Sequence, residues 1–556
     1  MRVKNIRDEQ MTKSILIASS GLVNENLFGD LGRILTSHIP ISGKLAINEL
    51  LKKTHEVYRN QYVMLDKSAS HLIGYIEKTF GAKVIVSDSK YSLGEAINRA
   101  SSVIAREVDS LDIIFGDSYK SDLLSKSEDK TDAIYVSKTL DSLAWMKVSR
   151  DIRNSKLLFA SEDILDIEAP RVSGSFKISN LTLFTDLLQK EISNKTADKA
   201  FWSTWEKYDE AQNYSVNLIT DKSWSDIGHI DTYYSARRNL ISSASRAFNT
   251  INLSSDLDRI IKSGPDSKMY EEKKWFENLP FELKKYAPAT YKSKNLSTYE
   301  IDYSTVIPLN EMWVAENNDD SYWLSFASKF REMLDELHKP IENNISQHEI
   351  VLCKKEIYID KVITRIDQFL KNSIFPLDYE SELNVNNCKM PSLNQVITGL
   401  KDIVKKLSKL NYWSVIHGDL CFSNIFYDRR KNQIKLIDPR GSFGKKGIFG
   451  DPVYDLMKFS HSALGDYDYL ACDLYTLVGK ENDFLLELAV PQKELVSRKI
   501  LRNELMVNVN KYDLNLKELR LLESTLFLSA AALHTESDRG LALFLKGLQI
   551  AKIGLD

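Results

Sequence analysis

Residues Trp413–Asp438 read WSVIHGDLCFSNIFYDRRKNQIKLID, and this stretch decides how the C-terminal half of the chain is interpreted. A short apolar run leads into the sequence HGD, which ends at Asp419, and Asn424 lies five residues further on. A charged turn then leads into a second apolar run that ends at Asp438. The pattern predicts a strand, a loop and a second strand, with the polar side chains of Asp419, Asn424 and Asp438 converging.

These three residue types are the ones that phosphoryl transfer requires. One carboxylate accepts the hydroxyl proton of the acceptor, while a second carboxylate and an amide oxygen bind Mg²⁺ beside the nucleotide phosphates. Taken singly, Asp419 and Asn424 are ordinary turn residues, and Asp438 is an ordinary end of a strand. Together, at this spacing, they favour a phosphotransferase.

The segment HGDLCFSN followed by IKLID resembles the aminoglycoside phosphotransferase/choline kinase-like superfamily, a relative of the protein kinases. The resemblance implies ATP and Mg²⁺ as cofactors, Asp419 as the catalytic base, and Asn424 and Asp438 as metal ligands. It implies that His417 organises the loop. In the downstream sequence GDPVYDLMKFSHS it implies that Asp455 braces the catalytic loop from a helix.

Arg440 departs from the family pattern, which often has an apolar or aromatic residue after the metal-binding Asp. Here Pro439-Arg440-Gly441 follows. Arg440 is therefore a candidate for holding a phosphate or an anionic substrate. A surface or ion-paired arginine is the alternative.

A kinase of this type needs a small lobe that covers ATP, and the mixed segment 236–310 fits that role, with a helical lobe over 311–556. Lys262 ends an apolar run, LDRIIK, and a charged helix pattern follows. In kinase-like folds a strand lysine contacts the phosphates and pairs with a glutamate on a helix. Glu271 or Glu272 could be that glutamate.

No G-x-G-x-x-G loop is present in this lobe. The family tolerates its absence, because its phosphate-covering loop varies and often contains serine. The Ser-rich segment SSASRAFN, which includes Ser243 and Ser245, could supply the backbone N–H groups instead.

The first half of the chain alternates short apolar runs with helical patterns. The run Ser14–Ala18 is followed by similar runs at Lys83–Ser87, Leu111–Phe115, Ala133–Val136 and Lys156–Phe159. Such alternation predicts a parallel sheet covered on both faces. We therefore expect a polar leader over 1–12 and an α/β domain over 13–235.

A second resemblance covers this α/β domain. LDIIFGDSY, which contains Asp117, and WSDIGH, which contains Asp226, look like the two metal-binding motifs of sugar-1-phosphate nucleotidylyltransferases. The resemblance implies a GT-A-like (Rossmann-like) fold in which both aspartates bind Mg²⁺. It also implies a second nucleoside triphosphate (CTP, UTP or dTTP), and Lys44 lies in the stretch IPISGKLAIN that follows the family's nucleotide loop.

The nucleotide loop itself departs from that family. Its first strand normally ends in a Gly-rich loop with a basic residue, whereas this chain reads SSGLVNENLFGDLGRI. Gly21 remains at the tight turn, and Arg33 could supply the positive charge. Because glycines let a backbone enclose phosphates, their loss leaves two readings open: an active nucleotidyltransferase, or a domain kept for binding or assembly.

The composition excludes several other classes. The 556 residues include 74 Lys and Arg against 77 Asp and Glu, a formal net charge of −3, so no basic surface for nucleic acid is expected. Apolar runs are too short for a membrane span, and the polar start is unlike a signal peptide. The four widely spaced cysteines favour reduced thiols in the cytoplasm.

Together these features predict a cytoplasmic bifunctional enzyme. Its C-terminal kinase would phosphorylate a small hydroxylated acceptor, a sugar in the leading interpretation, and its N-terminal domain would activate the product for capsule or lipopolysaccharide synthesis. The alternatives are a kinase with a non-catalytic N-terminal domain, a choline-, amino-alcohol- or aminoglycoside-type kinase, and a non-catalytic scaffold. A homo-oligomer stays open.

Overall fold

A computed structural model describes most of the chain: residues 13–120, 131–138, 145–151, 153–160, 169–194, 197–241, 250–254, 256, 258–291, 297–315, 319–373, 377–410, 412–491, 496–535 and 537–556. The leader 1–12 and the loop residues Ser243 and Ser245 lie outside the described residues. The chain divides into two compact units. Unit 1 comprises residues 1–240 with 315–317, and unit 2 comprises residues 241–314 with 318–556.

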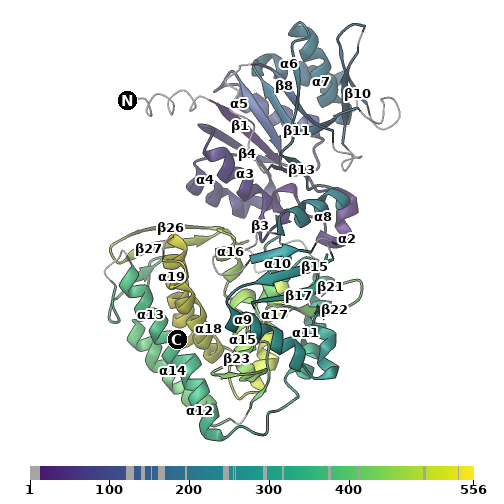
Figure 1. Cartoon of the computed structure of the whole chain (residues 1–556). Coiled ribbons are helices and arrows are strands. Elements are labelled where there is room, and N and C mark those ends of the chain that lie inside the picture. Colours follow the sequence, from purple (N-terminus) through teal and green to yellow (C-terminus); the bar gives the residue numbers. More distant parts are fainter. Residues whose placement is uncertain are drawn as a thin grey trace. The chain divides into compact units, whose positions relative to one another are not determined.

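Unit 1 is built on a nine-stranded sheet (Figure 1), with the strand order β10-β9-β11-β6-β1-β4-β5 and with β8 and β12 joined to it through β11. The strands are β1 (Ser14–Ser19), β4 (Asn60–Asp66), β5 (Lys83–Ser87), β6 (Leu111–Phe115), β8 (Ala133–Ser137), β9 (Lys147–Arg150), β10 (Leu157–Ala160), β11 (Arg171–Ile178) and β12 (Asn217–Thr220). The α/β class expected from the sequence is thereby confirmed.

The sheet is mixed, so the expectation of a parallel sheet was wrong for half of it. β1 pairs in parallel with β4 and β6, and β4 pairs in parallel with β5. β11 instead runs antiparallel to β6, β8 and β9. The described residues between β6 and β11 contain no helix, and without a helical crossover consecutive strands pair antiparallel.

Helices cover both faces of the parallel part. The helices of unit 1 are α2 (Phe28–Leu31), α3 (Ala46–His55), α4 (Ile73–Phe80), α5 (Leu93–Ile104), α6 (Leu181–Asn194), α7 (Ala197–Ala211) and α8 (Ile230–Asn239). Leu16, Met64 and Phe115 point into one core with α5, α6 and α7. The alternate residues Ile17 and Val63 point to the opposite face, where α3 packs against β1.

Unit 2 begins with a small antiparallel sheet and one helix. The sheet order is β14-β15-β17-β16, formed by β14 (Thr250–Leu253), β15 (Arg259–Ser263), β17 (Thr298–Asp302) and β16 (Thr290–Tyr291). Helix α9 (Asp266–Asn278) follows β15 directly. Strand β15 ends one residue after Lys262, so the lysine and the helix that follows it are held close together.

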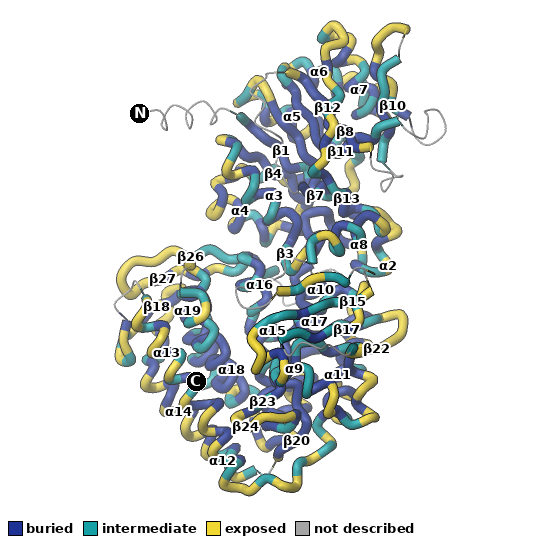
Figure 2. Tube along the Cα trace, viewed as in Figure 1, coloured by how far each residue is buried: buried dark blue, intermediate teal, exposed yellow. Residues whose placement is uncertain are grey.

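The rest of unit 2 is mainly helical. Its helices are α10 (Leu309–Ala315), α11 (Asp320–Leu337), α12 (Gln347–Lys355), α13 (Lys361–Asn372), α14 (Leu393–Leu407), α15 (Pro452–Ala463), α16 (Tyr467–Ala471), α17 (Val496–Asn510), α18 (Leu516–Ala531) and α19 (Asp538–Leu555). Figure 2 shows α18 as a largely buried helix. Helix α15 is also buried along most of its length and can hold side chains rigidly.

Short strands interrupt these helices. The paired strands are β20 (Ser414–Val415) with β25 (Phe449–Gly450), β21 (Ile425–Asp428) with β22 (Gln433–Leu436), and β23 (Ser442–Phe443) with β24 (Lys445–Lys446). A further sheet joins β18 (Asn384–Val385), β19 (Cys388–Lys389), β26 (Tyr475–Lys480) and β27 (Asp483–Leu488). The strand–loop–strand expected around Asp419 is thus present.

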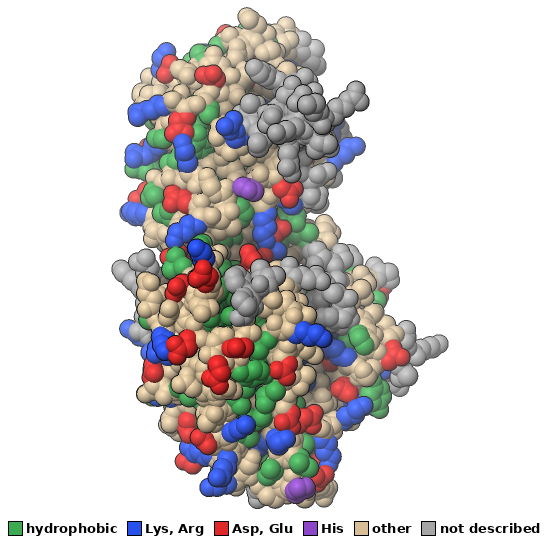
Figure 3. All heavy atoms as spheres, turned by 90° about the vertical axis from the view of Figure 1, so that its left-hand side faces the viewer, with side chains coloured by type: hydrophobic (Ala, Val, Ile, Leu, Met, Phe, Trp, Pro, Cys, Tyr) green, Lys and Arg blue, Asp and Glu red, His purple; other side chains and the backbone are tan. Residues whose placement is uncertain are grey.

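No helix within the described ranges is both long enough and apolar enough to span a bilayer. On the face drawn in Figure 3, lysine and arginine side chains are interspersed with aspartate and glutamate over both units.

Candidate functional sites

The HGD loop lies between β20 and β21. Asn424 ends a short 3-10 turn directly before β21, and its side-chain amide donates a hydrogen bond to the carbonyl of Asp419 at 2.8 Å. The backbone N–H of Ile437, directly after β22, donates to the carbonyl of Asn424 at 3.1 Å. The β21–β22 hairpin therefore brings Asp419, Asn424 and Asp438 into one region.

Asp455 on α15 holds the start of this loop. Its two carboxylate oxygens accept hydrogen bonds from the backbone N–H groups of His417 at 2.8 Å and of Gly418 at 2.7 Å. Asp455 is fully buried, and so is His417. Burial lowers the pKa of His417, and the neutral ring lies 3.3 Å from the backbone N–H of Asp419. The position of Asp455 fits the bracing role implied by the sequence resemblance.

The HGD loop also directly contacts the loop after β22, which contains Asp438 and Arg440. The backbone N–H of Arg440 donates to the carbonyl of His417 at 2.9 Å. Gly418 adopts a left-handed φ of 76°, and a Cβ there would lie 2.8 Å from the Cβ of Arg440. Asp438 has a φ of 56°, which is uncommon for a residue with a side chain. Such strain is frequently found where a side chain must point in a required direction.

Lys262 joins the small sheet to this region. Its Nζ lies 2.7 Å from Oε2 of Glu272 on α9 and 2.9 Å from Oδ1 of Asp438. Burial alone would lower the pKa of Lys262, but the charges of Asp438 and Glu272 outweigh it and raise the pKa. Tyr299 donates a second hydrogen bond to Glu272 at 2.8 Å. The lysine is therefore charged and held between two carboxylates.

The sequence left the choice between Glu271 and Glu272 open, and the geometry separates them. Glu272 is buried and contacts Lys262. Glu271 points elsewhere and pairs with Lys446 at 3.3 Å. Its backbone instead packs against Gly441, where a Cβ would lie 2.4 Å from the carbonyl oxygen of Glu271.

The residues present fit a Mg²⁺ ion near Asp438. Asn424 donates its side-chain N–H₂ to the Asp419 carbonyl, and its Oδ1 accepts one long hydrogen bond, 3.4 Å, from the Ser423 hydroxyl. A carbonyl oxygen has two lone pairs, so Oδ1 keeps acceptor capacity for a cation. The carboxylate of Asp438 is about one-third exposed. An amide oxygen and a carboxylate are ligand types that Mg²⁺ accepts, with water and phosphate oxygens completing its shell.

One cationic residue that was not predicted from the sequence, Lys458, lies beside Asp419. Nζ of Lys458, on α15, is 2.8 Å from Oδ1 of Asp419. Burial alone would raise the pKa of Asp419, but Lys458 outweighs it and holds the pKa well below its ordinary value. The available signal was the position of Lys458 one helical turn after Tyr454, inside the apolar sequence LMKFS.

Unit 1 brings its two candidate aspartates together. β7 (Ser118–Lys120) pairs antiparallel with β13 (Trp224–Asp226), and the backbone N–H of Ile227 donates to the carbonyl of Asp117 at 2.9 Å. Burial and the nearby charge of Asp226 raise the pKa of Asp117 to about 7. Among the described residues, Oδ1 of Asp117 is a buried acceptor with no hydrogen-bond partner. Such an orphaned oxygen fits a cation ligand.

Asp226 is more heavily bonded. It accepts hydrogen bonds from the backbone N–H of Gly228 at 2.8 Å and from the Thr232 hydroxyl at 2.7 Å, and the His229 ring contacts it at 2.8 Å. Burial alone would lower the pKa of His229, but Asp226 outweighs it and raises the pKa. His229 was not predicted as a site residue, although it lies in the quoted WSDIGH.

The altered loop lies beside this pair. The carbonyl of Gly21 accepts a hydrogen bond from the N–H of Thr36 at 2.8 Å, which closes the loop, and the N–H of Asn24 donates to the carbonyl of Gly228 at 3.2 Å. Arg33 has an exposed side chain. Lys44, on β3 (Lys44–Leu45), pairs with Glu49 at 3.3 Å.

Metal-binding clusters built solely from His, Cys, Asp and Glu are absent from the residues that the structure describes, where no group of three or more converges. This matches the composition of the two candidate sites. One has a carboxylate and an amide, and the other has two carboxylates.

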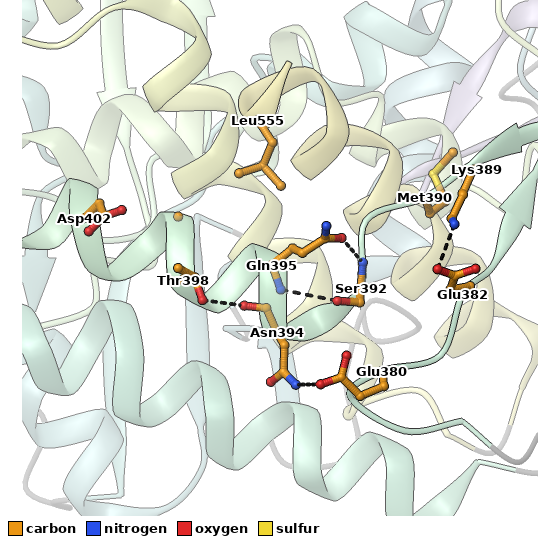
Figure 4. Close-up of a pocket in the computed structure, with 11 residues that line it drawn as sticks. Glu380, Glu382, Lys389, Met390, Ser392, Asn394, Gln395, Thr398, Asp402 and Leu555 are labelled. Atoms are coloured by element: carbon orange, nitrogen blue, oxygen red, sulfur yellow. Dashed lines mark hydrogen bonds and ion pairs between the residues drawn. The ribbon is translucent and has the colours of Figure 1, made fainter.

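A groove of about 600 Å³ lies elsewhere in unit 2, at the start of α14 and beside Leu555 near the C-terminus (Figure 4). Its lining includes Glu380, Ser392 and Gln395, and Ser392 and Gln395 cap the helix. It contains none of the residues that the sequence analysis singled out.

Comparisons with known proteins give the following. No protein-family model matches the chain, and no curated protein matches it. The N-terminal part is similar to solved structures of CTP:phosphocholine cytidylyltransferase from Streptococcus pneumoniae (12% identity, 41% of this chain and 98% of that chain, TM-score 0.33) and HddC from Yersinia pseudotuberculosis (19% identity, 41% and 100%, TM-score 0.31). It is also similar to the nucleoside-diphosphate-sugar pyrophosphorylase from Vibrio cholerae RC9 (11% identity, 40% and 99%, TM-score 0.32). Likeness at this level assigns no activity to this chain.

Proposed function

We propose that unit 2 is an ATP-dependent phosphotransferase that acts on a small hydroxylated acceptor, a sugar in the first instance. The observation that carries the proposal is the position of Lys262, within 2.9 Å of both Glu272 and Asp438. A strand lysine, a helix glutamate and a metal-binding aspartate must be placed together for kinase-type phosphoryl transfer.

In this proposal the chain performs three tasks. Asp419 accepts the proton of the acceptor hydroxyl, whose oxygen attacks the γ-phosphorus of ATP, and the bond from that phosphorus to the β-phosphate oxygen breaks to release ADP. Lys262 neutralises the α- and β-phosphates. Asn424 and Asp438 would hold Mg²⁺, which when bound neutralises the charge on the phosphate oxygens.

The test measures ADP formation by the full chain with ATP, Mg²⁺ and a panel of sugars, sugar phosphates, sugar acids and amino alcohols. Asp419→Asn is expected to reduce kcat with the best acceptor by at least about 100-fold, since a positioned general base contributes about 10²–10⁴. Asp402→Asn, a matched change at an exposed residue of α14, is the control. The proposal fails if no acceptor stimulates ADP formation, or if Asp419→Asn keeps the activity.

For unit 1 we propose nucleotidyl transfer to a sugar phosphate, which releases pyrophosphate. The supporting observation is the convergence of Asp117 and Asp226 beside the Gly21 loop, where a pair of carboxylates would hold Mg²⁺ against a triphosphate. The candidate nucleotides are CTP, UTP and dTTP. A non-catalytic binding domain is the competing interpretation, because the loop lacks the glycines that usually enclose phosphates.

Pyrophosphate release separates these two interpretations of unit 1. The full chain is incubated with each nucleoside triphosphate and each sugar 1-phosphate of a panel. Asp117→Asn is expected to abolish release, whereas Asp186→Asn, at an exposed position on α6, leaves it unchanged. Release from no pair of substrates would leave unit 1 as a binding domain.

Two consecutive steps in one chain would make an activated sugar in the cytoplasm for surface polysaccharide such as capsule or lipopolysaccharide. The support is chemical: a sugar phosphate made by unit 2 is the class of substrate that unit 1 would consume. Transfer of label from γ-³²P-ATP into a nucleotide-linked sugar, with both nucleotides present, would test the sequence of steps.

A further inference from the structure

Three basic side chains from different elements of unit 2 gather around Tyr454 and Asp419. Lys458 pairs with Asp419 at 2.8 Å. Nη1 of Arg440 donates to the Tyr454 hydroxyl at 2.9 Å, and its guanidinium lies 5.5 Å from the centre of the Tyr454 ring. Lys361 begins α13, directly after a π-helical turn at Glu356–Asp360. We call Lys361, Arg440 and Lys458 the cation cluster.

Tyr358, in the turn directly before Lys361, packs against Tyr454 with ring centroids 6.0 Å apart, so the start of α13 lies beside α15. Burial would raise the pKa of Tyr454, but Arg440, Lys458 and Lys361 outweigh it, and the pKa is lowered. Burial lowers the pKa of Lys361, and the charges of Arg440 and Lys458 lower it further, to about 8. The charge of Tyr454 acts in the opposite direction. A phenol whose pKa falls despite burial reports a strongly positive local potential.

The carboxylates nearby do not balance this charge. Asp419 is bonded to Lys458. The oxygens of Asp455 are taken by the backbone of His417 and Gly418, and Asp360 pairs with Lys355. Across the described part of the chain, the side-chain ammonium of Lys361 has no hydrogen-bond or ion-pair partner. Half-buried cations without counter-charges are costly, and a bound anion would offset that cost.

We propose that the acceptor of unit 2 carries an anionic group, a phosphate or a carboxylate, which binds to Lys361 and Arg440 while its hydroxyl reaches Asp419. This inference rests on the proposed phosphotransferase and specifies its substrate class. Two cations with N–H donors match the oxygens of such a group. The same cluster repels quaternary ammonium and polyamine acceptors, which selects against choline, amino alcohols and aminoglycosides.

The chemistry places the anion away from the transferred phosphate. Lys262 lies between Glu272 and Asp438, whereas Arg440 donates to Tyr454 on α15 and the charge of Lys361 acts on the same tyrosine. In this proposal Lys262 therefore binds the phosphates of the nucleotide, and the cation cluster binds the anionic group of the acceptor.

Inorganic phosphate is the first probe, used with the full-length protein saturated with Mg²⁺ and ADP so that the nucleotide site is filled. Binding is followed by calorimetry. Lys361→Met is expected to weaken the phosphate Kd by at least 10-fold at this site, while Lys361→Arg keeps it within about 3-fold. Lys401→Met, an exposed lysine on α14, is the matched control. An unchanged Kd in Lys361→Met would overturn the inference.

The second arm is the acceptor screen, with neutral hexoses, hexose phosphates, uronic acids and choline compared in ADP formation. The expected result is turnover with an anionic sugar and a KM raised at least 10-fold in Lys361→Met, with kcat and the ATP KM within about 3-fold. Turnover with choline or a neutral sugar that is indifferent to Lys361→Met would sink the inference but keep the kinase. No turnover with any acceptor, combined with phosphate binding lost in Lys361→Met, would sink the kinase and leave an anion site.

Discussion

Among the candidate nucleotide-binding residues, Lys262 is the one that pairs with two carboxylates of the site, Glu272 and Asp438. Lys262→Met would leave the buried Glu272 with Lys268, 3.7 Å away, in place of a cation at 2.7 Å, and would remove the proposed contact to the phosphates. We expect kcat/KM for ATP to fall by at least about 100-fold. If Lys262 acts mainly by binding ATP, most of this fall is an increase in the KM for ATP. The measurement is ADP formation at varied ATP.

Lys274→Met on the exposed side of α9 is the matched control, since Lys274 pairs with Glu277 in solvent. The two variants carry the same change on neighbouring elements. Equal activity in both would show that the Lys262 contacts are structural and have no catalytic consequence.

Asp455 contributes through backbone contacts. Asp455→Asn keeps the size of the side chain but gives it one acceptor oxygen in place of two, so one of the N–H groups of His417 and Gly418 loses its partner. A buried unsatisfied donor costs about 1–3 kcal/mol. We therefore expect a lower denaturation midpoint for unit 2, together with a lower kcat. An unchanged midpoint would show that the loop does not need this brace.

The charge of Lys361 gives a pH dependence with a definite sign. Its pKa is lowered to about 8 by burial and by the charges of Arg440, Lys458 and Arg365, against Tyr454. Below pH 8 the lysine is charged and holds an anion, and above it the charge is lost. The acceptor KM should therefore rise as pH passes through about 8. Lys361→Arg should show no such rise up to pH 9.5, because an arginine stays charged.

At the scale of elements, the loop after β22 is fitted to α9 by a glycine. Gly441 has a φ of 70°, and a Cβ there would lie 2.4 Å from the backbone oxygen of Glu271. Gly441→Ala would force the loop and α9 apart, in addition to about 1–2 kcal/mol for the left-handed backbone. We expect a larger loss of stability and activity than in Gly447→Ala. Gly447 also has a positive φ, 133°, but no atom of the described residues lies within 4 Å of where its Cβ would stand.

The elements of unit 2 also show which sequence patterns were informative. The apolar runs before HGD and in IKLID predicted β20 and β22, because short apolar runs bounded by turn residues determine strands locally. The sheet of β18, β19, β26 and β27 was not predicted. Its β18–β27 pairing joins residues about 100 positions apart, and no local pattern specifies such a partner.

At the scale of the whole molecule, each unit has its own pair of candidate carboxylates, so the two proposed activities can be tested separately. We expect Asp117→Asn to remove pyrophosphate release while ADP formation with ATP and acceptor stays within about 2-fold of wild type. Asp419→Asn should do the reverse. Both activities are measured on the same full-length preparations. Loss of both activities in either variant would contradict two independent sites.

The sequence by itself determined the α/β class of unit 1, the strand–loop–strand around Asp419, and the identity of the polar residues that end those strands. These features depend on neighbours in the chain: strand periodicity, turn residues and a short hairpin. Asp117 and Asp226 could be named as a pair only through a resemblance, because their contact depends on β7 pairing with β13.

The tertiary structure alone decided the rest. It selected Glu272 over Glu271, because only one face of α9 is buried against β15 and β17. It made half of the unit 1 sheet antiparallel, because the direction of each strand depends on whether the segment before it crosses over the sheet or turns directly back. It also brought Lys361, Arg440 and Lys458 around Tyr454. Charges from three separate elements acquire a common potential only when packing brings them together and excludes the water that would screen them.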